Sequence, residues 1–303
     1  MLGVTAQLVA LACHFNGQSQ GLEPPGFFPS NSTCQFCEFV HFLRPRRSWF
    51  GRDHKWSTTA STPDEWIQHE ARSGRKAVLS CQPTNGLRAD RLSAGFVGGG
   101  GRWQLNSATE RQMEAWEPSW EVGNREAADQ RVWRVQYRLI REEAPFVPRS
   151  TRSLQEMHNT LNLALSDALP FCEQHSIETF GTCFQTAIQC LSANDPFHLV
   201  YHRDLAPPEL LSLPAQQVLA ACQAAWVFGG MGSWNDMAFA EGEQDRYERL
   251  SDALFALLTE AIQVGTNSGA FLEKEERTRT FKKSAGRTLP SPRAPQTACP
   301  TWR

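Results

Sequence analysis

Residues 214–262 read PAQQVLAACQAAWVFGGMGSWNDMAFAEGEQDRYERLSDALFALLTEAI and contain two helical patterns joined by a glycine-rich segment. Apolar residues recur at three- and four-residue spacing in both patterns, which predicts two amphipathic helices. The apolar faces consist of Val218, Leu219, Cys222, Ala225 and Trp226 in the first, and of Tyr247, Leu250, Leu254, Leu257, Leu258 and Ile262 in the second. We expect the first helix to end at Gly229 or Gly230, since glycine adopts the left-handed conformation that closes a helix. Two such helices pack antiparallel, so the glycine-rich segment lies at one end of the pair.

The glycine-rich segment is the first candidate for a ligand-binding site. Glycines let a ligand approach the backbone closely, and neighbouring hydroxyl, amide and carboxylate groups can bind its polar atoms. The candidate residues are Gly230, Gly232, Ser233, Trp234, Asn235 and Asp236. A structural corner is the alternative and the one we expect, with Trp226 and Trp234 filling the space beside the glycines. Only the polar pair Asn235 and Asp236 distinguishes a ligand site from a structural corner, because glycine and tryptophan are compatible with either interpretation.

The segment Trp226–Asp236, with the sequence WVFGGMGSWND, is similar to one in a family of bacterial proteins of unknown activity. The resemblance extends over about the last third of the chain, up to Gly269. It implies a bacterial, cytosolic protein. Because no activity is known for the family, the resemblance transfers no catalytic residue.

The composition is that of a globular protein, with 303 residues, 41% of them hydrophobic, and a formal net charge of −2. So small a net charge creates no field that would attract nucleic acid or a membrane surface. No apolar run approaches the roughly 18 residues that span a bilayer. The apolar start, residues 2–13, lacks the basic region of a signal peptide, and we expect a buried strand or helix there. Nine cysteines, an odd number at irregular spacing, indicate free thiols in a reducing cytosol.

The first half of the chain has strand patterns and the second half has helical ones. Strands are predicted at residues 33–43, 76–81 and 132–139, a capped helix at 62–73, and further helices at 154–169 and 180–191. This order predicts an α+β fold, in which a mostly antiparallel sheet is followed by a bundle of about four helices. The expected regions are a β-rich region with one short helix at 1–149, a helical region at 150–270, and a disordered basic tail at 271–303.

Four consecutive glycines, Gly98–Gly101, interrupt the apolar run 92–105. We expect a turn there, and a bulge or a contact between backbone and ligand are the alternatives. Further on, Trp116 and Trp120 precede a charged stretch, residues 121–129. These aromatic and charged side chains are candidates for lining a cleft beside the sheet.

Cys34 and Cys37 form a C-x-x-C and are the candidates for a metal site. Zinc requires a second pair of ligands, and no such pair follows at a recognised spacing. In an extended strand the two thiols would point to opposite faces, which disfavours chelation. We therefore predict structural thiols and no bound metal or cofactor, with metal binding and redox chemistry as alternatives.

Residues 44–56 interleave arginine and lysine with Trp49, Phe50 and Trp56. Such a run is typical of proteins that stack on single-stranded nucleic acid or bind an anionic partner. Eight basic and three acidic residues give the tail 271–303 a charge of +5, which leaves −7 for the rest of the chain. We therefore favour a solvated loop for residues 44–56 over a nucleic-acid site.

No nucleophile elbow, metal set or phosphate-binding loop appears in the sequence. His202-Arg203-Asp204-Leu205 resembles the catalytic loop of protein kinases, but the downstream asparagine and the Asp-Phe-Gly are absent. Abundant tryptophan and arginine favour a soluble cytosolic protein that binds a protein or small molecule rather than a membrane or nucleic acid. The alternatives are a hydrolase or transferase that uses Glu121, Asp129 or Asp236 with a histidine, and a nucleic-acid-binding protein that uses residues 44–56.

Overall fold

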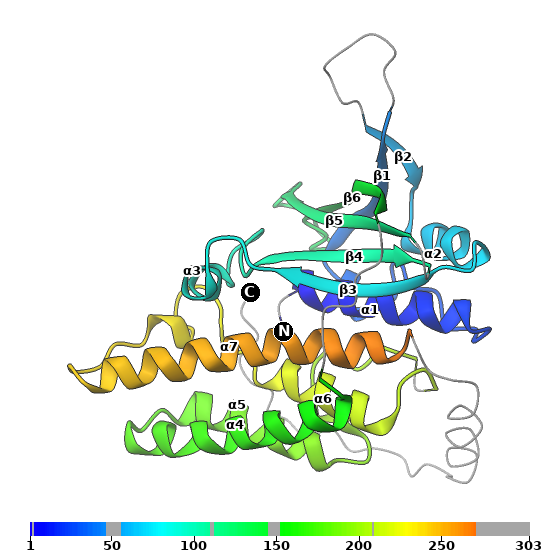
Figure 1. Cartoon of the computed structure of the whole chain (residues 1–303). Coiled ribbons are helices and arrows are strands. Elements are labelled where there is room, and N and C mark those ends of the chain that lie inside the picture. The colour runs from blue at the N-terminus through cyan, green and yellow to red at the C-terminus, as the bar shows by residue number, and fades with distance from the viewer. Residues whose placement is uncertain (2, 47–55, 110–111, 145–151, 208, 271–303) are drawn as a thin grey trace.

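A six-stranded β-sheet forms one layer of the molecule, and a layer of helices lies against it (Figure 1). The computed structural model describes the chain except residues 2, 47–55, 110–111, 145–151, 208 and 271–303. The strands are β1 (Cys37–Pro45), β2 (Trp56–Ala60), β3 (Lys76–Gln82), β4 (Arg102–Ala108), β5 (Met113–Val122) and β6 (Trp133–Ala144). Their order in the sheet is β2-β1-β6-β5-β4-β3. All neighbours are antiparallel except β1 and β6, which are parallel.

The helical layer follows the sheet in sequence, so the predicted α+β class is confirmed. Its α-helices are α4 (Leu154–Gln174), α5 (Glu178–Ser192), α6 (Leu213–Ala224) and α7 (Glu243–Ser268). Short 3-10 helices also occur, namely η1 (Ser32–Cys34), η2 (Pro196–Leu199) and η3 (Trp234–Asp236). The β-rich region contains the expected helix, α2 (Pro63–Arg72), and also α1 (Gly3–Ser19) and α3 (Leu87–Ser93). The tail 271–303, predicted to be disordered, lies outside the described residues.

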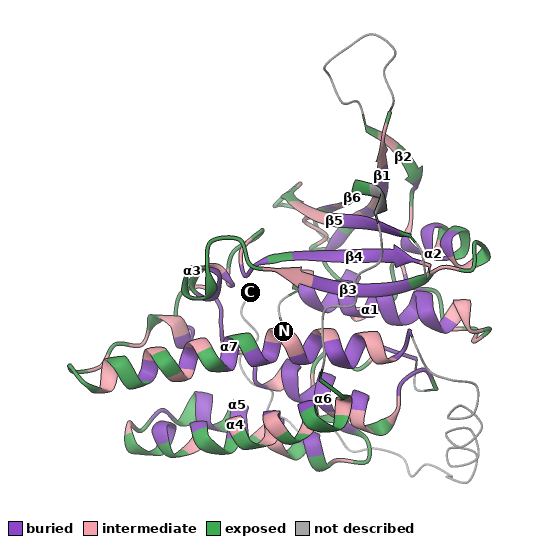
Figure 2. Cartoon of the chain, viewed as in Figure 1, coloured by how far each residue is buried: buried purple, intermediate pink, exposed green. Residues whose placement is uncertain are grey.

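The first apolar segment is a helix, which settles the choice between strand and helix left open by the sequence. Every residue of α1 from Thr5 to Gly17 is buried, as Figure 2 shows. A helix that is apolar all round has no amphipathic period and belongs in the interior. In Figure 1, α1 lies between the sheet and α7. One apolar core therefore includes side chains from the sheet, from α1 and from the helical layer.

Side-chain amides from two helices form hydrogen bonds with the backbone groups along the outer edge of β3. Asn16 of α1 accepts from the backbone N–H of Ala77 at 2.8 Å and donates to its carbonyl at 2.9 Å. Asn267 of α7 does the same for Leu79, at 2.7 and 2.9 Å. Gln263 accepts from the N–H of Cys81 at 3.0 Å. The edge of the sheet is thus closed by helices rather than by another strand.

The spacing of these amides follows from helix and strand geometry. Gln263 and Asn267 are four residues apart in α7, which corresponds to a rise of about 6 Å along the helix. Leu79 and Cys81 are two residues apart in β3, which corresponds to about 6.6 Å along the strand. The two distances match, so side chains on one face of α7 meet alternate residues of β3 in register.

The helices predicted from residues 214–262 pack antiparallel, as expected. Gly265 of α7 lies against Leu219 of α6, because a Cβ on Gly265 would come within 2.9 Å of the Leu219 side chain. Further along, the Cys222 thiol lies 4.0 Å from the carbonyl of Leu258. The first helix ends at Ala224, before the predicted Gly229 or Gly230. The segment after it is extended, and the carbonyl of Val227 accepts from the N–H of Trp234 at 3.2 Å.

Among the described residues, no helix is both long enough and apolar enough to cross a lipid bilayer.

We expect Asn267→Ala to destabilise the protein by about 2 to 3 kcal/mol, because it leaves two backbone groups of the buried residue Leu79 without partners. Urea denaturation measures the effect. Asn159→Ala is the matched control, since Asn159 is exposed on α4 and its side chain accepts from the neighbouring Gln155; we expect it to stay within about 0.5 kcal/mol of the parent. Equal losses in the two variants would contradict the role given to the β3 edge.

Candidate functional site

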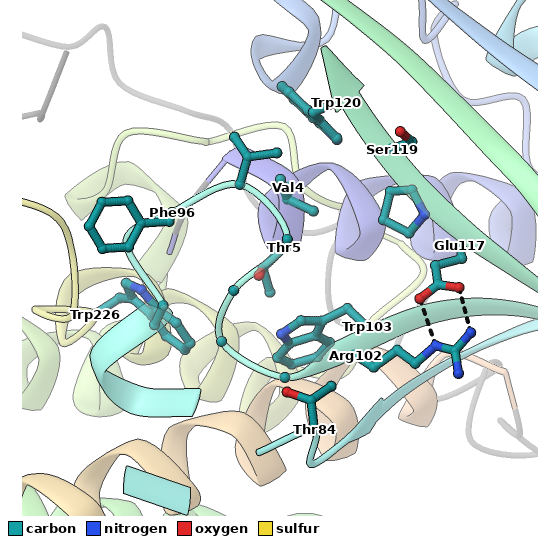
Figure 3. Close-up of a pocket in the computed structure, with 17 residues that line it drawn as sticks. Val4, Thr5, Thr84, Phe96, Arg102, Trp103, Glu117, Ser119, Trp120 and Trp226 are labelled. Atoms are coloured by element: carbon teal, nitrogen blue, oxygen red, sulfur yellow. Dashed lines mark hydrogen bonds and ion pairs between the residues drawn. The ribbon is translucent and has the colours of Figure 1, made fainter. Parts of the chain in front are cut away.

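A pocket of about 510 Å³ opens where β4 and β5 separate, beside the first turns of α1 (Figure 3). Pairing of these strands extends only from Ala108 and Met113 to Leu105 and Trp116. Beyond that point the strands diverge, and their ends line the pocket. The lining consists of Val4, Thr5, Thr84, Ala94, Trp226 and residues 96–103 and 117–120.

Glycine and proline account for the separation of the two strands. Gly100 and Gly101, just before β4, have φ angles of 80° and 90°, which other residues rarely adopt. Pro118 of β5 has no N–H to donate to a second neighbouring strand. Pairing of β5 with β6 nevertheless continues to Val122. Among the described strands, none therefore pairs with the other side of β5 beyond Trp116.

Gly98 and Gly99 complete the expected turn, and all four glycines line the pocket. The N–H of Phe96 donates to the Ser93 carbonyl at 2.9 Å, and the N–H of Gly99 donates to the Phe96 carbonyl at 3.0 Å. Gly98 has a φ of 80°, as the third residue of such a turn requires. The turn presents Phe96 and Val97 outward, with exposed fractions of 65% and 53%.

Three tryptophans form the apolar walls. Trp103 extends from β4, Trp120 from β5, and Trp226 from the segment after α6 (Figure 3). Ring contacts hold two of them, since Trp120 meets Trp133 edge-on at 5.8 Å and Trp226 lies 5.8 Å from Phe255. The indole nitrogens of Trp120 and Trp226 are buried and have no hydrogen-bond partner among the described residues. Ring contacts therefore hold Trp120 and Trp226 in position, whereas Trp103 is largely covered, with 5% of its surface exposed.

The polar groups of the pocket are few. At the rim, Arg102 donates to both carboxylate oxygens of Glu117, at 2.6 and 2.8 Å, as the dashed lines in Figure 3 show. Thr84 is held by Asp90, which accepts from the Thr84 hydroxyl at 2.5 Å and from its N–H at 2.9 Å. Burial opposes ionisation of Asp90, but the hydrogen bonds from Thr84 and Asn85 outweigh it and lower the pKa of this carboxyl. The pocket thus combines aromatic walls with hydroxyl and glycine backbone groups, and the charges at its edge are balanced.

The six residues predicted as a ligand site form a corner next to this pocket and are not among its lining residues. Trp234 is fully buried, and its indole N–H donates to the Ser251 hydroxyl at 2.7 Å. The Tyr247 hydroxyl donates to the Trp234 carbonyl. Ser233 donates to the Gly229 carbonyl at 3.1 Å. These bonds tie the segment to α7.

The polar pair of the segment also makes internal contacts. The Asn235 side chain accepts from Arg91 at 3.0 Å and donates to the Arg91 carbonyl at 3.0 Å. The carboxylate of Asp236 accepts from the N–H of Gly232, whose φ is 78°. Gly230 has open space where a side chain would be. The geometry is that of the corner we expected, and the ligand-binding role of these residues stays a prediction.

Sequence reasoning missed Arg91, which is fully buried in α3. Its guanidinium also pairs with Glu248 and with Asp252, the latter at 2.7 Å. The residue therefore joins α3, the corner segment and α7. No local pattern marks it, because its partners lie about 150 residues away in the sequence.

The C-x-x-C does not have the predicted geometry. The sulfur atoms of Cys34 and Cys37 both lie 3.6 Å from the side-chain nitrogen of Gln7. The prediction of opposite faces was wrong because Cys34 belongs to η1 and only Cys37 to the strand. The hydrogen bond to Cys37 and burial raise the pKa of the Cys34 thiol. Among the described residues, no cluster of three or more His, Cys, Asp or Glu residues could hold a metal.

Most of the basic aromatic run lies outside the described residues, at 47–55. Arg44 is described, and it faces carboxylates rather than solvent. Its guanidinium lies 2.7 Å from Glu114, 3.4 Å from Glu70 and 5.0 Å from the ring centre of Trp116. Arg44 is therefore engaged with two buried carboxylates, although its own side chain is 28% exposed.

The carboxylates proposed for catalysis are dispersed. Glu121 lies 3.7 Å from Arg138, and Asp129 lies 3.9 Å from Arg131. In the described part of the chain, neither these carboxylates nor Asp236 contacts a histidine. The hydrolase or transferase alternative therefore gains no assembled catalytic group from these residues.

A serine, a histidine and an aspartate do meet at η1. The Ser32 hydroxyl lies 2.8 Å from Nδ1 of His202 and also donates to Asp204. The Ser32 N–H donates to the same carboxylate at 2.7 Å. In a hydrolytic triad the histidine lies between the other two groups, whereas here the serine does. The cluster joins η1 to the loop before α6.

Comparisons with models of protein families, with curated proteins and with solved structures find no match to this chain.

We expect Trp234→Ala to lower the free energy of unfolding by about 3 to 5 kcal/mol, because a fully buried indole is removed. Met231→Ala in the same segment is the control, since Met231 is 90% exposed, and we expect a change within about 0.5 kcal/mol. Chemical denaturation gives both values. If the two variants lost similar stability, Trp234 would not be the core of the corner.

Stability should also fall between pH 6.5 and pH 4. Burial lowers the pKa of His202 from 6.5 to about 4, so over this window the unfolded chain binds a proton that the folded protein does not. The stability present above pH 6.5 then decreases by about 3 kcal/mol as the pH falls to 4. Urea midpoints across this range measure the loss. His202→Gln should make the profile shallower, leaving the part that comes from His14, whose pKa burial also lowers. His198→Gln on η2 should leave the profile unchanged, and the reverse result would rule out His202 as a cause.

Proposed function

We propose that this chain is a binding protein whose pocket between β4 and β5 holds an apolar group containing an aromatic ring. The observation that carries the proposal is the wall of Trp103, Trp120 and Trp226 around about 510 Å³ of space. Small-molecule and side-chain sites have volumes of roughly 300 to 1,000 Å³ and are lined mainly by apolar and aromatic groups. A ring stacked or edge-on against these indoles gains both burial and aromatic contact.

The remaining polar groups suit orientation rather than chemistry. Thr5, Thr84 and Ser119 supply hydroxyls, and Arg102 with Glu117 supplies a neutral ion pair at the rim. No histidine or cysteine is among the lining residues. Binding without reaction is therefore the function that this set of side chains supports best.

We further infer a soluble, cytosolic protein of bacterial origin. The resemblance of the segment Trp226–Asp236 to bacterial proteins supports the origin. The free thiols of Cys13, Cys34, Cys37, Cys172, Cys190 and Cys222 support the compartment. The expectation of free thiols throughout was wrong for Cys183, which is disulfide-bonded. Reduced cysteine in such number is typical of the cytosol.

The fluorescent dye 1-anilinonaphthalene-8-sulfonate tests the pocket, because its rings become emissive in apolar surroundings. We expect the native protein to bind it at one site. Val4→Phe enlarges a half-buried side chain of α1 that lines the pocket and should weaken binding about tenfold or more, a loss of about 1.4 kcal/mol.

Ser57→Phe is the control for an added phenylalanine, on β2 at the far edge of the sheet. It should leave dye binding unchanged. Absence of dye binding to the native protein, or equal losses in the two variants, would refute the proposed pocket.

A further inference from the structure

One edge of β5 is open inside the pocket. Pairing with β4 ends at Trp116, whereas pairing with β6 on the other side continues to Val122. Residues 117–120 of this open stretch line the pocket, and Figure 3 shows β5 and β4 diverging around it. The outer edge of β3, by contrast, is closed by side-chain amides. An open edge beside a pocket is the arrangement by which a sheet takes up an extended peptide.

Apolar surface continues from the pocket outward. Phe96 and Val97 line the pocket and are also 65% and 53% exposed. Beside them the backbones of two loops touch, because a Cβ on Gly95 would lie only 2.0 Å from the carbonyl carbon of Gly229. Met231, two residues beyond, is 90% exposed.

This outer apolar surface extends beyond the area that a small ligand in the pocket would cover. A bound small molecule is largely enclosed by its pocket, so it would leave Met231 in water. Exposed apolar side chains next to a pocket instead mark the contact surface of a larger partner. The turn at Phe96–Gly99 presents two of these side chains in a fixed conformation.

We propose, on the basis of the function proposed above, that the ligand is an extended segment of a partner polypeptide. Its backbone pairs with the open edge of β5 at Trp120 and at the carbonyl of Pro118, which has no N–H to offer, and one aromatic or large aliphatic side chain enters the space between Trp103, Trp120 and Trp226. Residues on either side of this anchor cover the apolar surface at Phe96, Val97 and Met231. The open edge supplies affinity for backbone, and the tryptophan pocket selects the anchor.

Selection from a library of short, linear, random peptides displayed on phage tests this proposal. The full chain is the target, and the Val4→Phe protein removes peptides that bind elsewhere. We expect enriched peptides to share an aromatic or large aliphatic residue. N-methylation at alternate positions of a synthetic copy should weaken binding about tenfold or more, and N-methylation at the intervening positions should not, because only alternate N–H groups face the neighbouring strand.

Two substitutions distinguish the contribution of the outer surface to peptide binding from that of the pocket. Met231→Glu should weaken peptide binding and leave dye binding unchanged, because Met231 is outside the pocket. Leu163→Glu is the control, since Leu163 is 64% exposed on α4, and it should affect neither.

Each contrary outcome has a distinct meaning. If the dye binds but no peptide is enriched, the pocket serves small molecules and the polypeptide partner is refuted. If enriched peptides tolerate N-methylation at every position, pairing with β5 is refuted. If neither dye nor peptide binds, the proposed function itself fails.

Discussion

The outer edge of β3 carries backbone groups that must find partners in a buried place, and three side-chain amides provide them. Asn16 belongs to α1, whereas Gln263 and Asn267 belong to α7. An unsatisfied buried N–H or C=O costs about 1 to 3 kcal/mol, so these bonds define the position of both helices against the sheet. The sheet and the helical layer consequently share one core, and the amides of the helices lie opposite alternate residues of β3.

A second junction lies at the other end of α7. Arg91 is fully buried, and its charge is balanced by Glu248 and Asp252. A buried arginine is tolerated only when carboxylates and hydrogen bonds surround it. Because Asn235 shares these bonds, the corner after α6 is joined to α3 and therefore to the turn that borders the pocket. The corner positions the pocket without lining it.

The pocket itself arises where regular structure stops. Left-handed glycines come directly before β4, and Pro118 accompanies the loss of pairing on β5. Elsewhere such an interruption would be filled by core side chains, but here the space is bordered by rigid indoles and by an exposed turn. The irregular residues thus create both features on which the proposed polypeptide binding depends, the open strand edge and the aromatic pocket.

The sequence by itself determined the α+β order, the capped start of α2 at Thr62, and the antiparallel pair of helices in residues 214–262. Periodicity reports which side of a local segment faces the core, so amphipathic elements can be read from it. Periodicity did not distinguish helix from strand for α1, because α1 is buried on all sides. It also led to the wrong orientation for the thiols of Cys34 and Cys37, because a 3-10 helix precedes the strand.

Only the tertiary structure decided where a site could form. The sequence directed attention to the glycine-rich segment 229–236, to the four glycines at 98–101 and to Trp120 as separate features. Folding places the first next to the pocket and the other two in its wall. The physical reason is that the pocket is made by segments far apart in the chain, whose contacts with one another leave no period or spacing in the sequence.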